Sequence, residues 1–171
     1  MRKSPPSRPP IANAKRTFHI VASRFNTQYV DGLVDHVTTE LRALAPDGRI
    51  LVHRVPGSFE IPVIARELAI QDQADAIIAC GVILQGETDH AQNLSRSVTD
   101  ALQCIAIENG VPVINVVLSF DDENQARARC LENKINRGTE AARAAVEIAN
   151  VLSQIRSEQG AAVSKSPRHN G

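Results

Sequence analysis

The sequence predicts an α/β domain in which a central parallel sheet is flanked by helices. Short apolar runs alternate with helical patterns along most of the chain, which is typical of β-α-β units. Right-handed crossovers between parallel strands then place helices on both faces of the sheet. The length of 171 residues suits one domain, and a hydrophobic content of 43% is enough to fill its core. Because Trp is absent and only one Tyr and four Phe occur, that core must be aliphatic.

The first half of the chain contains two predicted strands and two predicted helices. Residues 17–23 (TFHIVAS) form an apolar run that predicts a buried strand. A helix follows, because apolar residues recur on one face at helical spacing: Val30, Leu33, Val34, Val37, Leu41 and Leu44. Pro46 to Gly48 form a turn, residues 49–55 a second strand and residues 61–69 a short helix.

The second half continues the alternation. Residues 76–80 (AIIAC) form a third strand, which Gly81 closes. A helix over residues 89–109 ends at Gly110, a residue type that commonly follows a helix C-terminus. The β-branched run at 111–118 is the fourth strand, and two further helical stretches lie at residues 123–132 and 139–155.

The two ends of the chain depart from this pattern. Residues 1–16 contain five basic residues, no acidic residue and four prolines, so we expect a disordered or extended arm without a secretory signal. Residues 158–171 are polar and are expected to form a disordered tail. The domain itself is therefore assigned to residues 17–157.

Composition argues against several classes of protein. The formal net charge is zero, which argues against a general nucleic-acid-binding protein. No apolar run approaches the length of a membrane span, and neither GxxxxGK[ST] nor GxGxxG occurs. The three cysteines lie far apart and no histidine has a partner at metal-ligand spacing, so we expect no metal and a reducing, cytoplasmic setting.

The loops that follow the strands are the candidate ligand-binding segments, because the crevice of a parallel sheet lies beyond the carboxyl ends of its strands. The first contains Phe25, either a hydrophobic staple under the next helix or a flat platform for a planar ligand. Asn26 beside it is most often an N-cap. In the second loop (VPGSFEIP, 55–62), Glu60 either accepts hydrogen bonds from a polyol or is a solvated carboxylate that opens a helix.

The third loop, GVILQGETDH at 81–90, carries the strongest local signal. Gly86 allows close approach of the backbone to an anion, and Thr88 can cap the following helix. His90 falls in the first turn of that helix, where it is either structural or an acid–base residue. Beyond the fourth strand lie four cations that could reach a phosphate or form a solvated face: Arg127, Arg129, Lys134 and Arg137.

Together these segments resemble the lumazine synthase family. Arg24-Phe25-Asn26 resembles the family's RFN, VPGSFEIP its VPGxxExP, and GVILQGETDH its GxVIxGxTxH. Residues 136–138 (NRG), followed by an Ala-rich helix, resemble its closing N-[KR]-G motif. The match covers residues 17–156 in order and with nearly constant spacing, which is far more specific than any single motif.

The resemblance implies a flavodoxin-like three-layer fold with a four-stranded parallel sheet. It also implies an enzyme that condenses 5-amino-6-(D-ribitylamino)uracil with 3,4-dihydroxy-2-butanone 4-phosphate, without cofactor or metal, in the penultimate step of riboflavin biosynthesis. His90 would shuttle protons. Residues implied for the ribitylaminopyrimidine are Phe25, Asn26, Ser58, Phe59, Glu60, Val82, Ile83, Leu84 and Asn115. Residues implied for the butanone phosphate are Glu87, Thr88 and, from a neighbouring subunit, Arg129.

The sequence departs from the family pattern at several positions. Asn115 stands where many members carry an aromatic residue that closes a neighbouring subunit's pocket. A family lysine that accompanies the phosphate-binding arginine is replaced by Asn133, and nearby glycines by Leu131 and Ile135. The residues AQNLSRS after His90 replace an aromatic–acidic pair.

The resemblance further implies a homo-oligomer built from pentamers, with active sites shared between adjacent subunits. Some pentamers of the family stay free or pair, and others close into large shells, which the proline-rich arm could obstruct. Two alternatives to an enzyme stay open. One is a non-catalytic flavin- or lumazine-binding protein on the same scaffold, and the other is an assembly protein whose shell is its function.

Overall fold

The structure, a computed structural model, describes residues 7–12, 14–71, 73–86 and 90–164, excepting the side chains of 161–164. Its described part contains a sheet of four parallel strands in the order β2-β1-β3-β4. The strands are β1 (Thr17–Ser23), β2 (Arg49–Val55), β3 (Ala76–Leu84) and β4 (Val113–Phe120). The predicted α/β class with a four-stranded parallel sheet is confirmed.

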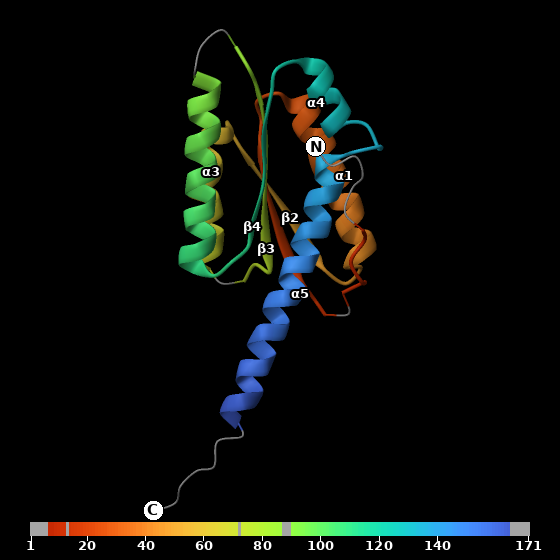
Figure 1. Ribbon diagram of the computed structural model, residues 1–171, viewed down its shortest axis with the longest axis vertical. Helices are drawn as coiled ribbons and strands as arrows, with labels where there is room; N and C mark the ends of the chain where they lie inside the picture. The colour runs from red at the N-terminus through yellow and green to blue at the C-terminus, as the bar shows by residue number, and fades with distance from the viewer. Residues whose placement is uncertain (1–6, 13, 72, 87–89, 165–171) are drawn as a thin grey trace, which may run out of the picture.

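Helices cover both faces of this sheet (Figure 1). The helices are α1 (Thr27–Leu44), α2 (Ile61–Ile70), α3 (His90–Asn109), α4 (Glu123–Cys130) and α5 (Arg137–Ser164). One face packs against α2 and α3, and the other against α1, α4 and α5. None of the described helices is long and apolar enough to cross a membrane.

Two aliphatic cores result, because successive strand residues point to opposite faces. Val21 and Ile77 are fully buried under α2 and α3, whereas their neighbours Ile20 and Ile78 are fully buried under the other three helices. No described aromatic residue except Tyr29, Phe18 and Phe120 contributes to these cores. Phe25 and Phe59 are therefore left outside them.

Strand β3 is longer than predicted. Gly81 does not close it but pairs with Val117 on β4, and the ladder continues to Leu84 opposite Phe120. Glycine is tolerated inside this strand because Ser58 occupies the space that a side chain at position 81 would fill. β4 likewise begins and ends two residues later than the predicted 111–118.

The helices begin close to the predicted positions. α3 ends at Asn109, and Gly110 has φ 64°, the left-handed conformation expected of the residue after a helix. α5 differs more, because it starts at Arg137 and passes both the predicted helix end and the boundary at residue 157 to reach Ser164. Gln154 and Glu158, one helical turn apart, are hydrogen-bonded across the predicted helix end.

Residues 7–12 lie against α1 and α5. Arg8 donates two hydrogen bonds of 2.8 Å to the carboxylate of Glu40 on α1, and Arg143 on α5 donates another of 2.8 Å. The Ala12 amide donates to the Leu44 carbonyl (2.8 Å). Glu40 is only 6% exposed, and the hydrogen bond from Arg8 and then that from Arg143 outweigh burial and hold its pKa below the usual value.

Replacing Glu40 with Gln is expected to lower the free energy of unfolding by about 1–2 kcal/mol near neutral pH, allowing for the solvent around Arg8. Because the folded-state pKa is depressed, the stabilisation by Glu40 is present above the unfolded-state pKa of 4.5 and is lost as the pH falls through the folded-state value. Thermal denaturation at a series of pH values should show the variant and wild type converging below about pH 4.5. Glu158→Gln, an exposed change on α5, is the control and should not show a difference from wild type that depends on pH in this way. A Glu40→Gln deficit that stays constant through the acid range would contradict this account.

Candidate active site

The loops after β1 and β2 meet at the carboxyl edge of the sheet. A Cβ atom added to Gly57 would lie 3.5 Å from Cδ2 of Phe25 and 3.0 Å from Oε2 of Glu60. The Phe25 ring and the Glu60 carboxylate therefore flank the same glycine. Phe25 is 71% exposed, so its ring is available as a platform and is not a staple buried under α1.

Asn26 occupies the N-cap position of α1, but its side chain does not cap the helix. Instead, Nδ2 of Asn26 donates a hydrogen bond of 2.8 Å to the carbonyl of Val82 on β3. The backbone of Asn26 is left-handed, with φ 54° and ψ 44°. The sequence-based interpretation of Asn26 as an ordinary N-cap is thus wrong about its side chain.

The second loop forms a short 3₁₀ helix over Ser58–Glu60 that leads directly into α2. Ser58 is buried, and a Cβ atom at Gly81 would lie 2.6 Å from its Oγ, so the loop packs tightly onto β3. Phe59 is 66% exposed. Glu60 is partly buried at the N-cap position of α2 without a side-chain capping bond, which leaves both sequence-based interpretations of this carboxylate open.

The third loop begins where β3 ends. The Val82 side chain is buried, Leu84 is partly exposed, and the Gln85 amide extends the ladder with a hydrogen bond of 2.9 Å to the Phe120 carbonyl. His90 is the first residue of α3 and is exposed. The predicted phosphate-binding residues Glu87 and Thr88 lie outside the described residues.

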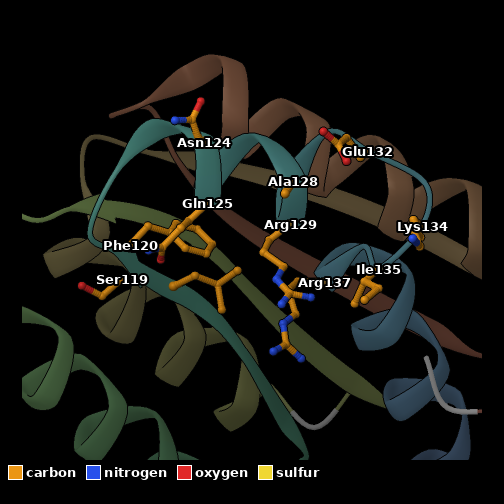
Figure 2. A pocket seen from close by; sticks show the side chains of 11 residues that line it. Ser119, Phe120, Asn124, Gln125, Ala128, Arg129, Glu132, Lys134, Ile135 and Arg137 are labelled. Carbon is orange, nitrogen blue, oxygen red and sulfur yellow. The ribbon is translucent and has the colours of Figure 1, made fainter. Parts of the chain in front are cut away.

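A groove of about 780 Å³ lies along the outer side of edge strand β4 (Figure 2). Arg129 near the end of α4 and Arg137 at the start of α5 project into it together, and Lys134 lines it as well. Glu132 is also among the lining residues but points away from the two guanidinium groups (Figure 2). Arg127 does not line the groove, so three of the four cations proposed from sequence are gathered there.

Asn115 lies on β4 and its side chain is engaged within its own chain. Its Oδ1 accepts a hydrogen bond from the Val117 amide (2.9 Å), and its Nδ2 donates to Oγ1 of Thr99 on α3 (3.0 Å). Among the described strands β4 lies at the edge of the sheet, so this bond occupies a backbone amide that faces none of the other three. Asn115 is five residues before the end of β4 and is therefore remote from the loops at the carboxyl edge.

One chain thus brings part of the predicted site together. Phe25, Asn26, residues 58–60 and residues 82–84 lie around the ends of β1, β2 and β3. Arg129 lies beyond β4, and two strand spacings, roughly 10 Å, separate β4 from β1. Sequence reasoning missed the Asn26–Val82 bond and the Ser58–Gly81 contact, because each joins segments that are distant in the sequence.

Comparison with known proteins gives a consistent result. The sequence profile of the family described as 6,7-dimethyl-8-ribityllumazine synthase matches residues 15–153. A protein of that name from Nitrosomonas europaea is 40% identical over 134 residues, which span 78% of this chain and 79% of the relative. Another from Paraburkholderia phymatum is 41% identical over 133 residues, 77% of this chain and 75% of the relative. A third, from Nitrosospira multiformis, is 37% identical over 77% of this chain and 81% of its own length.

Proposed function

The chain belongs to the 6,7-dimethyl-8-ribityllumazine synthase family and catalyses that reaction in riboflavin biosynthesis, and from this premise we propose which residues hold the two substrates. The observation that carries the proposal is the convergence of three loops at the carboxyl edge of β1, β2 and β3. This is the position of ligand sites in open parallel sheets. The relatives do not favour the alternative hypothesis of a non-catalytic flavin- or lumazine-binding protein.

The flat pyrimidine is proposed to stack on Phe25 beside Asn26. An exposed aromatic ring at the mouth of a site offers a large apolar face at little entropic cost. Ser58, Phe59 and Glu60 are proposed to hold the ribityl chain, since Glu60 and the Ser58 loop lie next to that ring. The backbone of residues 82–84 then faces the edge of the heterocycle, and Asn115 would approach it only from a neighbouring subunit.

The butanone phosphate is proposed to bind through Glu87, Thr88 and Arg129. A guanidinium group suits phosphate because it offers a planar fork of donors. Three cations, Arg129, Arg137 and Lys134, line this groove with one carboxylate, Glu132, so the local charge favours an anion although Arg137 is also ion-paired with Glu140. The position of this groove on an edge strand supports the proposal that Arg129 serves an adjacent subunit.

We propose a homo-oligomer built from pentamers, in the cytoplasm. A shared site accounts for the separation between the Phe25 loop and the Arg129 groove within one chain. Exposed apolar side chains on α3 and α5, namely Ile107, Ile148, Val151 and Ile155, are also suited to contact with other subunits. The cysteines of the chain are unpaired, as is usual in a reducing compartment.

The reaction needs orientation and proton transfer more than a nucleophile. The aromatic amine of the pyrimidine adds to the ketone and loses water to give an imine, phosphate leaves, and the ring closes with loss of water. Holding two substrates in register supplies much of the acceleration. His90 is proposed to carry protons in these steps.

The decisive experiment mixes purified protein with both substrates and follows lumazine fluorescence and phosphate release. Lumazine should form only when both substrates are present. Tight riboflavin binding without phosphate release would instead support the binding-protein alternative. Light scattering on chains with and without residues 1–16 tests the assembly and the influence of the arm.

Replacing His90 with Ala is expected to lower kcat by about 10²-fold, the lower end of the usual effect of a general acid–base residue. The oligomer should persist, because His90 is exposed at the start of α3. Gln92→Ala, an exposed change in the same helical turn, is the matched control. Steady-state kinetics with added imidazole complete the test, since partial rescue is expected only for His90→Ala. Unchanged kinetics would remove His90 from the mechanism.

A further inference from the structure

Asn26 joins two segments of the site that are 56 positions apart. Its side-chain amide donates to the Val82 carbonyl over 2.8 Å, well within the range of a good hydrogen bond. Among the described non-glycine residues, Asn26 alone has a positive φ. Asparagine tolerates this conformation better than most residues, which explains why the turn can be made without glycine.

The other hydrogen bonds that residues 24–27 make from this loop do not reach β3. The Arg24 amide donates to the carbonyls of Val55 and Pro56, at the β2 side of the loop. The Thr27 hydroxyl donates to the Arg24 carbonyl within the loop itself. Among the described residues, the bond from Asn26 is therefore the only hydrogen bond that ties residues 24–27 to β3.

This hydrogen bond links two segments that the proposed site places around the pyrimidine. Asn26 directly follows the exposed Phe25 ring, and Val82 begins the backbone segment 82–84. A planar ring that stacks on Phe25 and meets this backbone must fit the gap between them. A hydrogen bond already made in the free protein fixes that gap before the ligand arrives, which lowers the ordering cost of binding.

We propose that Asn26 is a positioning residue that sets the distance between the Phe25 ring and the β3 backbone for the ribitylaminopyrimidine. The inference rests on the proposed roles of Phe25 and residues 82–84. The Asn26 side chain binds the Val82 carbonyl, so Asn26 acts on the heterocycle through the Phe25 ring and the backbone of residues 82–84. The butanone phosphate, bound by other groups, is not affected by this spacing.

The test compares Asn26→Gly with Asn26→Asp and Thr27→Ala. Glycine keeps the left-handed backbone and removes the amide, so the gap is no longer fixed before the ligand arrives, and KM for the ribitylaminopyrimidine should rise about tenfold because the loop must then be ordered on binding. KM for the butanone phosphate and kcat should change little. Aspartate keeps the shape but turns an acceptor toward the Val82 carbonyl, so its effect on the same KM should be larger. Thr27→Ala removes a bond that does not reach β3 and should leave both KM values unchanged.

Two further outcomes separate the inference from the site assignment. If Phe25→Ala raises KM for the pyrimidine but Asn26→Gly does not, the positioning role is refuted and the site stands. If Phe25→Ala leaves that KM unchanged, the proposed pyrimidine site itself fails. A parallel rise of both KM values together with a lower melting temperature in Asn26→Gly would show a merely structural role and would also overturn the inference.

Discussion

Replacing Arg129 with Met is expected to lower kcat/KM for 3,4-dihydroxy-2-butanone 4-phosphate by about 10³-fold, because the cation proposed to hold the phosphate is lost. Arg129 lines the β4 groove together with Arg137 and Lys134. Methionine keeps much of the aliphatic volume and removes the charge. Lysine at the same position keeps the charge without the planar fork, so Arg129→Lys should retain intermediate activity.

Arg127→Met is the matched control for this change. Arg127 is an exposed residue on the same helix, α4, and does not line the groove. Steady-state kinetics with each substrate varied in turn should therefore show near wild-type constants for Arg127→Met. Equal losses in the two variants would mean that only the net charge of α4 matters, and the phosphate assignment would fail.

Mixed oligomers test whether Arg129 acts in a neighbour's site. If sites are shared, chains with Arg129→Met and chains with Phe25→Ala can be mixed in equal amounts. About a quarter of the interfaces should then combine an unchanged Phe25 from one chain with an unchanged Arg129 from its neighbour. Activity of the mixture should then exceed that of either variant alone. No gain after refolding the two chains together would place both residues in the same chain's site.

The largest effect on stability is expected from Gly138→Ala. A Cβ atom there would lie 2.5 Å from the Leu33 carbonyl oxygen and 3.0 Å from both Oδ1 of Asn136 and Cβ of His36. The first of these contacts is with backbone, so α5 must move away from α1 to relieve it. We expect a loss of about 3 kcal/mol or more in the free energy of unfolding, at the upper end of overpacking effects.

Gly160→Ala is the matched control, since Gly160 lies on the same helix with nothing within 4 Å of an added Cβ atom. This change should stabilise the helix by up to about 1 kcal/mol, the propensity difference between the two residues. Thermal denaturation with both variants at the same protein concentration compares them directly, because the melting temperature of any oligomer would depend on concentration. A Gly138→Ala protein as stable as wild type would refute the close approach of α5 to α1.

The fold was largely predictable because its signals are local. β1 and β2 have the predicted bounds, since each is an apolar or alternating run that ends at turn or loop residues. The end of β3 was not predicted correctly. Position 81 requires a glycine because Ser58, which is distant in the sequence, fills the space that a side chain would need. A local pattern cannot distinguish that glycine from one that ends a strand.

The site was predictable only in part for the same reason. The position of Phe25 and residues 58–60 after strand ends identified them as candidates. Asn26 was interpreted from its place before a helix, whereas its partner Val82 is far away in the sequence. Arg127 and Arg129 looked equivalent in sequence, but residues two apart on a helix point in different directions, and only Arg129 lines the groove.

The hydrogen bond from the Val117 amide to Asn115 has a consequence for how copies of this chain can join. An edge strand normally offers its free amides to another strand, and pairing of this kind can extend a sheet from molecule to molecule without limit. On β4 one such donor is already used by a side chain of the same strand. A second strand that paired with this edge would have to displace the Asn115 side chain, so the bond works against extension of the sheet from one molecule to the next.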